Sequence, residues 1–495
     1  MKYAISGHEG KTAVEEVILS LLPGVPLQRV EAAALDGDWL LSQMRREGRE
    51  SVLRSRACLG GRVTEDERRV TDGLDSQENR RRLTHELKLS VYAVLRPFLA
   101  EDPPWGSMTG VRPGKLARRL LEEGRGEEEA ARIPQNRYFV TPRRSQLALA
   151  AARCARQIGQ TLGPGQVAVY AGIPFCPSRC SYCSFVSQAV EQARALVEPY
   201  VDTLCREIRL TGDMLRQLGT QVTSLYVGGG TPTTLSASLL EGVLEELARQ
   251  FASPALREFT VEAGRPDTID EDKLRRMRAC GVDRISINPQ SMNPAVLQAI
   301  GRSHTPEQVL SSYALARRVG FENINMDVIA GLPGDEEESF AQTMRTLLSL
   351  QPENITVHTL AAKKGAAKGD KRPSPGQIAR VRGMVDRSIA LLTAAGYRPY
   401  YLYRQKYMAG GLENVGWCRA DMVNEYNVVM MEEIQSVISL GAGGVTKLVD
   451  PRTGAVRRFA NSKYPFEYHR ELDKIQRSKE QIADGLRQLW GRPEE

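Results

Sequence analysis

Short apolar runs alternate with longer helical patterns between about residues 165 and 400. The short runs are rich in β-branched and aromatic side chains and predict strands, whereas apolar residues at helical spacing between them predict helices. The predicted strands cover residues 167–170, 224–227, 259–262, 284–287, 324–329 and 355–358. The predicted helices cover about 194–218, 237–250, 271–279, 306–319, 336–349 and 376–395. Strand-then-helix units in succession predict a parallel sheet with helices outside it, as a full or partial barrel or as a doubly wound sheet.

The sequence on either side of this pattern differs from it in composition and in the spacing of apolar residues. Residues 1–150 are rich in Arg and Glu, with helical spacing around 85–99 and strand-like runs only near 4–6 and 51–54. We therefore expect an α-rich N-terminal accessory domain (1–150) whose Arg runs are solvated faces, with an acidic partner surface as the alternative. We expect residues 165–400, which carry the strand-and-helix pattern, to form the core domain. Residues 401–495 begin with aromatic-rich sequence and predict a small C-terminal α/β lobe.

Composition narrows the class of protein. The chain has 495 residues, of which 41% are hydrophobic and 26% charged, which is typical of a folded protein of two or three domains. The net charge of +7 is mild and suits an acidic small molecule as well as it suits nucleic acid. The sequence near residue 1 has no apolar signal-like run, and no stretch approaches about 18 apolar residues, so we expect a cytoplasmic protein without a membrane partner.

Three of the eight cysteines form one motif directly after the first predicted strand. Cys176, Cys180 and Cys183 have the spacing C-x3-C-x2-C, and the other five cysteines are scattered singly, which is not a disulfide framework. Three thiolates on one loop can hold three corners of a 4Fe-4S cluster and leave one iron open to a chelating ligand. Structural zinc is the alternative, but it usually takes four ligands in two pairs and the sequence has no second pair.

Polar residues and glycines recur where the following strands end. Gly229, Gly230 and Thr231 follow the second strand, Glu262 ends the third, and Gln290 follows the fourth. Each could be a helix cap or a turn residue. Because catalytic groups of parallel barrels gather at the carboxyl ends of the strands, their recurrence favours one shared site.

These motifs together resemble the radical S-adenosylmethionine (SAM) superfamily, and within it the oxygen-independent coproporphyrinogen III oxidase group. Within this group, the sequence is most similar to the HemZ-type coproporphyrinogen dehydrogenases. The motifs that carry this similarity are ISINPQ (285–290), NINMD (323–327), VHTL (357–360), YYLYRQ (400–405), LENVG (412–416) and PWGSMTGVRP (104–113). The resemblance implies an α/β fold with a partial (β/α)6 TIM-like radical SAM barrel. One departure is Gly172, because the oxidases usually have His at this position of their Tyr-x-His-x-Pro-Phe-Cys motif.

The resemblance also implies roles for individual residues. Cys176, Cys180 and Cys183 would ligate the cluster. The residues implied to contact or surround SAM are Tyr170, Tyr182, Gly229, Gly230, Thr231, Glu262, Gln290, Arg302, Asp327, Ile329 and Ala361. Arg302 suits the carboxylate of SAM and Asp327 suits its ribose hydroxyls.

The implied activity is oxidative decarboxylation without O2. Cleavage of SAM at the 4Fe-4S cluster would give a 5′-deoxyadenosyl radical, which converts two propionates of coproporphyrinogen III to vinyl groups and yields protoporphyrinogen IX in haem biosynthesis. A reductant such as flavodoxin or ferredoxin would supply electrons. The alternatives are a haem chaperone or another radical SAM enzyme acting on tetrapyrroles, and, more remotely, a zinc-stabilised nucleic-acid-binding protein. The carriers' His-Asn-Arg type motif is missing from 400–495, where His469 is the only histidine.

Overall fold

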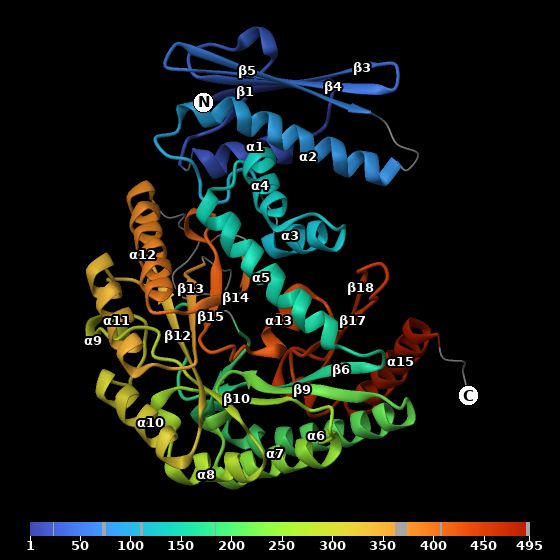
Figure 1. Ribbon diagram of the computed structural model, residues 1–495, viewed down its shortest axis with the longest axis vertical. Helices are drawn as coiled ribbons and strands as arrows, with labels where there is room; N and C mark the ends of the chain where they lie inside the picture. Colours follow the sequence, from blue (N-terminus) through green and yellow to red (C-terminus); the bar gives the residue numbers. More distant parts are fainter. Residues whose placement is uncertain are drawn as a thin grey trace.

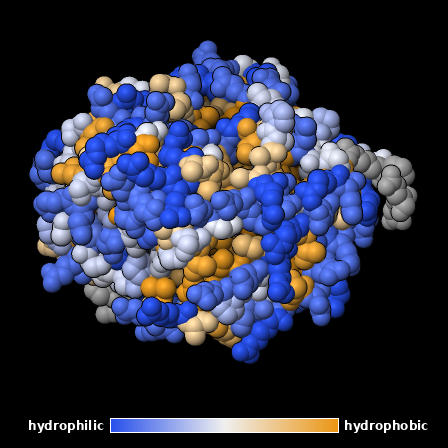
Figure 2. Space-filling view, turned by 90° about the horizontal axis from the view of Figure 1, so that it is seen from below, coloured by the Kyte–Doolittle hydropathy of each residue, from blue (hydrophilic) through white to orange (hydrophobic). Residues whose placement is uncertain are grey.

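The computed structural model describes residues 1–22, 24–71, 76–108, 112–183, 185–361, 374–405 and 408–491. A large α/β body carries a smaller sheet with its helices at one end (Figure 1). The motif at 104–113 is described except for residues 109–111. Among the described residues, no helix is long and apolar enough to cross a bilayer. Seen from below, the surface is mainly hydrophilic, with hydrophobic side chains in several separate areas (Figure 2).

The body is built on a sheet whose central strands are parallel. The parallel order is β13, β12, β11, β10, β9, β6, formed by β6 (Gln166–Ile173), β9 (Gln221–Gly229), β10 (Glu258–Gly264), β11 (Arg284–Ile287), β12 (Asn323–Ala330) and β13 (Asn354–Thr359). These strands are largely buried because helices cover the sheet, which is why each reads as a nearly continuous apolar run. All six predicted strands are confirmed, and so is the partial radical SAM barrel.

The predicted helices are confirmed too. They are α6 (Val190–Gln217), α7 (Ala237–Phe251), α8 (Glu271–Ala279), α10 (Pro306–Val319), α11 (Glu337–Leu350) and α12 (Pro375–Ala394). Two of them begin with a capping box, in which Thr305 pairs with Gln308 and Ser374 with Gln377. Such boxes satisfy backbone N–H groups that the first helical turn leaves without partners. The short helix α9 (Pro294–Ala299) adds a turn after β11.

The C-terminal segment extends the same sheet at both edges. On one edge, β15 (Asn414–Cys418) pairs antiparallel with β13 and with β14 (Arg398–Tyr403). On the other edge, β16 (Ser436–Leu440) pairs parallel with β6 and is followed by β17 (Val445–Val449) and β18 (Val456–Ala460). Helices α13 (Glu425–Glu432), α14 (Pro465–Tyr468) and α15 (Leu472–Trp490) complete this segment. It is therefore α/β, as expected, but its strands join the core sheet; the domain boundaries themselves stay a prediction.

The N-terminal segment contains more β-structure than the sequence pattern predicts. Its sheet has the order β2, β1, β3, β4, β5, from β1 (Lys2–Ser6), β2 (Gln28–Arg29), β3 (Trp39–Glu47), β4 (Glu50–Leu59) and β5 (Arg62–Thr71). The expected helices are present as α1 (Lys11–Leu21), α2 (Ser76–Leu95), α3 (Pro113–Glu122), α4 (Glu127–Tyr138) and α5 (Pro142–Thr161). Charged residues on the exposed face of β3 and β5 form ion pairs such as Arg69–Glu47, so these strands lack the apolar run that marks a strand in the sequence.

Candidate functional site

A cavity of about 340 Å³ lies at the carboxyl ends of the parallel strands. Of the predicted site residues, all except Tyr170 line this cavity: Cys176, Cys180, Cys183, Tyr182, Gly229, Gly230, Thr231, Glu262, Gln290, Arg302, Asp327, Ile329 and Ala361. They come from every parallel strand of the barrel, as expected for a site at the strand ends. The short pair β7 (Phe175–Cys176) and β8 (Gln188–Ala189) frames the cysteine loop.

The cysteine loop follows β6 and is fastened to its surroundings. The backbone N–H of Ser181 donates to the carbonyl of Ile300 at 3.1 Å, and that of Cys183 donates to the carbonyl of Cys180 at 3.1 Å. Within the described residues, no three His, Cys, Asp or Glu side chains surround a position for a single metal ion. A cubane cluster does not need such convergence, because each thiolate binds a different iron. The three-thiol donor set on one wall of the cavity therefore fits a 4Fe-4S cluster.

The glycine motif after β9 lies directly against this loop. The N–H groups of Gly230 and Thr231 donate to the carbonyls of Ile173 and Phe175, each at 2.8 Å. A Cβ at position 230 would lie 2.5 Å from the Phe175 oxygen and 3.0 Å from Cys176 Sγ. Only glycine therefore permits this approach, and the side-chain-free backbone stays open to the cavity.

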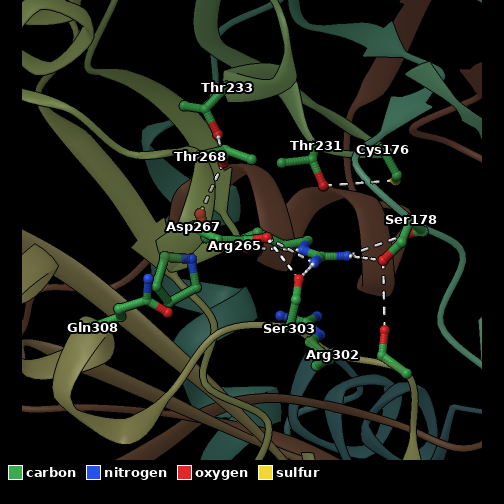
Figure 3. Close-up of polar contacts among 12 residues, drawn as sticks. Cys176, Ser178, Thr231, Thr233, Arg265, Asp267, Thr268, Arg302, Ser303 and Gln308 are labelled. Atoms are coloured by element: carbon green, nitrogen blue, oxygen red, sulfur yellow. Dashed lines mark hydrogen bonds and ion pairs between the residues drawn. The ribbon is translucent and has the colours of Figure 1, made fainter. Parts of the chain in front are cut away.

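A buried arginine holds the cysteine loop from the other side (Figure 3). Arg265 Nη1 donates to Ser178 Oγ at 2.8 Å and to its carbonyl at 3.3 Å, and Nη2 donates to Ser303 Oγ at 3.0 Å. Both carboxylate oxygens of Asp267 accept from the same guanidinium at 2.8 and 3.0 Å. Sequence reasoning missed Arg265, although it directly follows β10 beside the predicted Glu262.

A second arginine reaches the loop at Tyr182. Arg302 Nη2 donates to the Tyr182 hydroxyl at 3.0 Å and Nη1 to the carbonyl of Asn288 at 2.9 Å. Burial raises the pKa of Tyr182 above its usual value, so the hydroxyl stays protonated. The positive charge of Arg302 thus borders the cavity without a carboxylate partner within the described part of the chain, which suits an anionic ligand.

Two carboxyl groups in the cavity have opposite electrostatic environments. Glu262 Oε1 accepts from the Tyr226 hydroxyl at 2.6 Å, and burial raises the pKa of Glu262 to about 7. Burial also acts on Asp327, but the neighbouring His358 and Asn325 side chains outweigh it and lower the pKa of Asp327. Asn325 Nδ2 donates to Asp327 Oδ1 at 2.7 Å, and His358 Nε2 lies 3.8 Å from Oδ2. Near neutral pH, Asp327 is therefore ionised, while Glu262 is partly protonated and partly ionised.

Gln290 leaves an acceptor free at the cavity. Its backbone is left-handed (φ 65°), its N–H donates to the carbonyl of Asp327 at 2.9 Å, and its own carbonyl accepts from the N–H of Ile329 at 3.1 Å. Gln290 Oε1 and Asn288 Oδ1 are both buried without a partner among the described residues. Buried acceptors normally have partners, so these two atoms fit a bound ligand that donates hydrogen bonds, such as SAM.

The remaining predicted residues lie at the margins of the site. Tyr170 does not line the cavity; its ring stacks with those of Tyr226 and Tyr426, with centroids 6.2 and 6.1 Å away. Ile329 belongs to a small apolar cluster against which Tyr182 packs. Ala361 follows β13 and bridges to Met408. Gly172, the departure from the oxidase motif, accepts from the Tyr200 hydroxyl at 2.5 Å and packs against Gly441 after β16.

Sequence reasoning also missed several lining residues. They are Tyr226, Asn288, Asn325, Thr356, His358, Tyr401, Tyr403, Gln405, Asn414, Asn427 and Met431. Four of these lie within the motifs YYLYRQ and LENVG, which signalled the family but carried no assigned role. The antiparallel strands β14 and β15 bring those motifs to the cavity.

Comparisons with known proteins agree with this geometry. The chain matches the radical SAM superfamily over residues 170–347. It is 38% identical over 377 residues to the oxygen-independent coproporphyrinogen-III oxidase-like protein HemZ of Bacillus subtilis, covering 74% of this chain and 75% of HemZ. It is 28% identical over 336 residues to the heme chaperone HemW of the same organism, covering 65% of this chain and 83% of HemW.

A solved structure gives the same result. Coproporphyrinogen III oxidase (HemN) from Escherichia coli, a radical SAM enzyme, superposes with a TM-score of 0.52 at 25% identity, over 66% of this chain and 73% of HemN. The predicted family and fold are confirmed, together with the 4Fe-4S cluster and SAM that members of the superfamily use. The chain belongs to the radical SAM superfamily and, within it, to the oxygen-independent coproporphyrinogen III oxidase-like group.

Proposed function

We propose that this protein is a coproporphyrinogen III dehydrogenase that converts two propionate side chains to vinyl groups without O2, giving protoporphyrinogen IX. The observation that carries the proposal is the meeting of the cysteine loop with polar groups from the ends of the central parallel strands in one cavity, in a chain 38% identical to HemZ over three quarters of both proteins. We place the reaction in the cytoplasm.

When bound, the cluster and SAM supply the 5′-deoxyadenosyl radical. Each propionate then loses one hydrogen atom to the nucleoside, CO2, and one electron to an acceptor, which leaves a vinyl group. A one-electron reductant such as flavodoxin or ferredoxin would start each turnover.

The chain's own residues orient the groups that react. Arg302 would hold the carboxylate of SAM, because its guanidinium faces the cavity with donors to spare. Asp327 and Gln290 would accept hydrogen bonds from the ribose and amino groups. Tyr226 keeps Glu262 in place through its 2.6 Å hydrogen bond, and Arg265 holds the loop that carries the thiolates.

A haem carrier is the second candidate function, because proteins named heme chaperones are among the relatives of this chain. HemW proteins of several bacteria match this chain, among them that of Escherichia coli at 30% identity over 234 residues. A carrier would bind haem without turning over coproporphyrinogen, so the two functions differ in a measurable product.

The test is an anaerobic assay with excess SAM and a one-electron acceptor, since each coproporphyrinogen III needs two turnovers. The protein would be reconstituted with iron and sulfide, reduced with dithionite, and supplied with SAM and coproporphyrinogen III. We expect 5′-deoxyadenosine, CO2 and protoporphyrinogen IX, and none of these from Cys180→Ala. Cys205→Ala is the matched control, because Cys205 lies on α6 away from the cavity. Deoxyadenosine without a vinyl product would reject the dehydrogenase, and tight haem binding in the same preparation would favour the carrier.

A further inference from the structure

A second and larger cavity, of about 1190 Å³, lies between the N-terminal helices and the C-terminal hairpin. Its walls are α3, the second half of α5, and the turn between β17 and β18, which face one another in Figure 1. No lining residue of this interdomain cavity, as we call it, also lines the cysteine cavity.

The interdomain cavity has an excess of positive charge. Its lining includes six basic side chains against the three carboxylates of Glu122, Glu433 and Asp450; the basic side chains are Arg112, Lys115, Arg118, Arg119, Arg156 and Arg452. Glu433 is already held by several cations, including Lys115 at 2.8 Å and Arg458 at 3.1 Å. Arg118 pairs with Glu122, Arg119 with Glu123 and Arg452 with Asp450, so of the six only Arg156 makes no ion pair with a described carboxylate. The lining nevertheless keeps more basic side chains than carboxylates, and this excess favours an anion.

The polar groups of this cavity are not saturated. Arg118 Nε and His85 Nε2 are buried and have no partner within the described residues. Arg156 is exposed on α5 and makes no ion pair with any described carboxylate. Burial, together with repulsion from Arg112 and Arg458, lowers the pKa of the adjacent Lys447 to about 8, as expected where cations crowd together.

The lining also contains apolar and aromatic side chains from several elements, which together we call the apolar wall. It is formed by Met108, Leu116, Leu121, Tyr138, Ile434 and Val449. The His85 and Tyr138 rings contact each other there, with centroids 5.3 Å apart. A ligand that fills such a space needs an apolar body as well as negative groups.

The cavity is distinct from the cysteine cavity but lies close to it. Its α5 residues Gly159 and Gln160 precede β6, whereas the cysteine loop follows β6. On another side, Glu433 of its lining stands only two residues after Met431, which lines the cysteine cavity. A ligand here would therefore occupy a second site next to the one that holds the cysteine loop.

We propose that the interdomain cavity binds a small amphipathic polyanion, with two or more carboxylate or phosphate groups on an apolar or aromatic body. Arg156 and Arg452, from opposite walls, would hold the negative groups while the apolar wall packs against the body. Porphyrin carboxylates and nucleotide phosphates share this chemistry. A porphyrin as the ligand rests on the proposed function, since the enzyme would then bind a tetrapyrrole at a second site as well.

The test compares binding of three probes to the reconstituted full chain by anaerobic equilibrium dialysis. Coproporphyrin III carries carboxylates on an aromatic body, ATP carries phosphates on one, and tripolyphosphate carries phosphates alone. The variant R156Q/R452Q removes a cation from each wall, and R153Q/R470Q is the matched control because both of its arginines lie outside the cavity. We expect about tenfold weaker binding in R156Q/R452Q and less than twofold weaker binding in the control.

The outcomes separate this inference from the proposed function. The inference is supported if coproporphyrin III or ATP binds and R156Q/R452Q weakens this binding whereas R153Q/R470Q leaves it unchanged. The probe that binds also identifies the source of the negative groups. Binding of tripolyphosphate as tight as that of ATP would overturn the role of the apolar wall. If none of the three probes binds in a way that depends on Arg156 and Arg452, the proposed site is wrong. Formation of vinyl product by the wild type and by R156Q/R452Q is scored separately and decides the proposed function alone.

Discussion

The absence of one side chain allows the cysteine loop and the end of β9 to touch. Gly230 has an ordinary negative φ, so its role is close approach rather than a left-handed backbone. The carbonyl of Phe175 and the sulfur of Cys176 occupy the space that a methyl group would need. Because interiors are close-packed, the loop must shift if this space is filled.

Gly230→Ala is therefore expected to impair cluster binding while the fold survives. We expect iron content after anaerobic reconstitution to fall at least severalfold. Gly242→Ala on α7 is the control, since a Cβ there meets nothing within 4 Å and alanine in a helix stabilises by roughly 0.5–1 kcal/mol. Full iron and SAM binding by Gly230→Ala would show that the loop tolerates displacement.

Glu262 gives the cavity a pH-dependent charge. Burial raises its pKa to about 7, so the folded state prefers the protonated form more than the unfolded chain does. The stabilising effect of that preference is complete below the unfolded pKa of about 4.3 and is lost as the pH rises through about 7.

Glu262→Gln should remove this loss, because the amide does not ionise. We expect the free energy of unfolding of the wild type, relative to Glu262→Gln, to fall by on the order of 2 kcal/mol between pH 5 and pH 7.5. Urea unfolding of both proteins at several pH values, without SAM, measures the difference. A difference that is constant over this range would mean that Glu262 titrates normally.

At the scale of elements, the cysteine loop is held between two strand ends and the turn after α9. Arg265, which follows β10, joins Ser178 on the loop to Ser303 beyond α9. Its guanidinium also meets Asp267 with two parallel hydrogen bonds, so all of its donor directions are fixed. Lysine has neither the planar fork nor the number of donors to replace it.

Arg265→Lys should loosen the loop without abolishing the fold. We expect the reconstituted cluster to lose iron to a chelator several times faster than in the wild type under anaerobic conditions. Arg275→Lys on α8 is the matched control, because its ion pair with Glu271 is exposed. Equal rates of iron release in all three proteins would show that the loop does not depend on the Arg265 contacts.

The elements predicted best are those whose burial shows in the sequence. β11 coincides with its predicted range because all four of its residues are buried. By contrast, β5 alternates exposed charged residues with partly buried ones, and its pairing with β4 depends on contacts between strands that no local pattern reveals. The tendency of a segment to form a strand depends largely on its contacts with neighbouring strands.

The site was predictable where residues follow a parallel strand, and not where topology brings distant segments together. Glu262 and Asp327 lie at strand ends, and their convergence follows from the barrel itself. Tyr401 and Asn414 reach the cavity on the antiparallel strands β14 and β15, whose order the sequence does not specify. Arg265 also follows a parallel strand, but its role comes from contacts with Ser178 and Ser303, which lie on loops far apart in the sequence.

At the scale of the whole molecule, one buried carboxylate connects the N-terminal helices to the barrel. Glu413 Oε2 accepts from Trp105 Nε1 at 2.6 Å, and Glu413 Oε1 forms an ion pair at 2.9 Å with Arg144 on α5. Arg144 also pairs with Asp386 on α12. The carbonyl of Glu413 accepts from Thr359 Oγ1 at 2.7 Å, next to Asn414 in the cysteine cavity. The N-terminal motif around Trp105 thus supports the wall of the site.

Glu413→Gln should destabilise the whole protein, because Arg144 is almost fully buried and would keep only Asp386 as a charged partner. Breaking a buried pair on one side typically costs about 3–5 kcal/mol, whereas an exposed pair contributes at most about 1 kcal/mol. Glu127→Gln, which breaks the exposed pair with Arg153, is the matched control. Urea unfolding measures both, and SAM binding should weaken in Glu413→Gln alone because Asn414 and Thr359 are displaced with Glu413. Unchanged stability in Glu413→Gln would mean that apolar packing, not this pair, joins the N-terminal helices to the barrel.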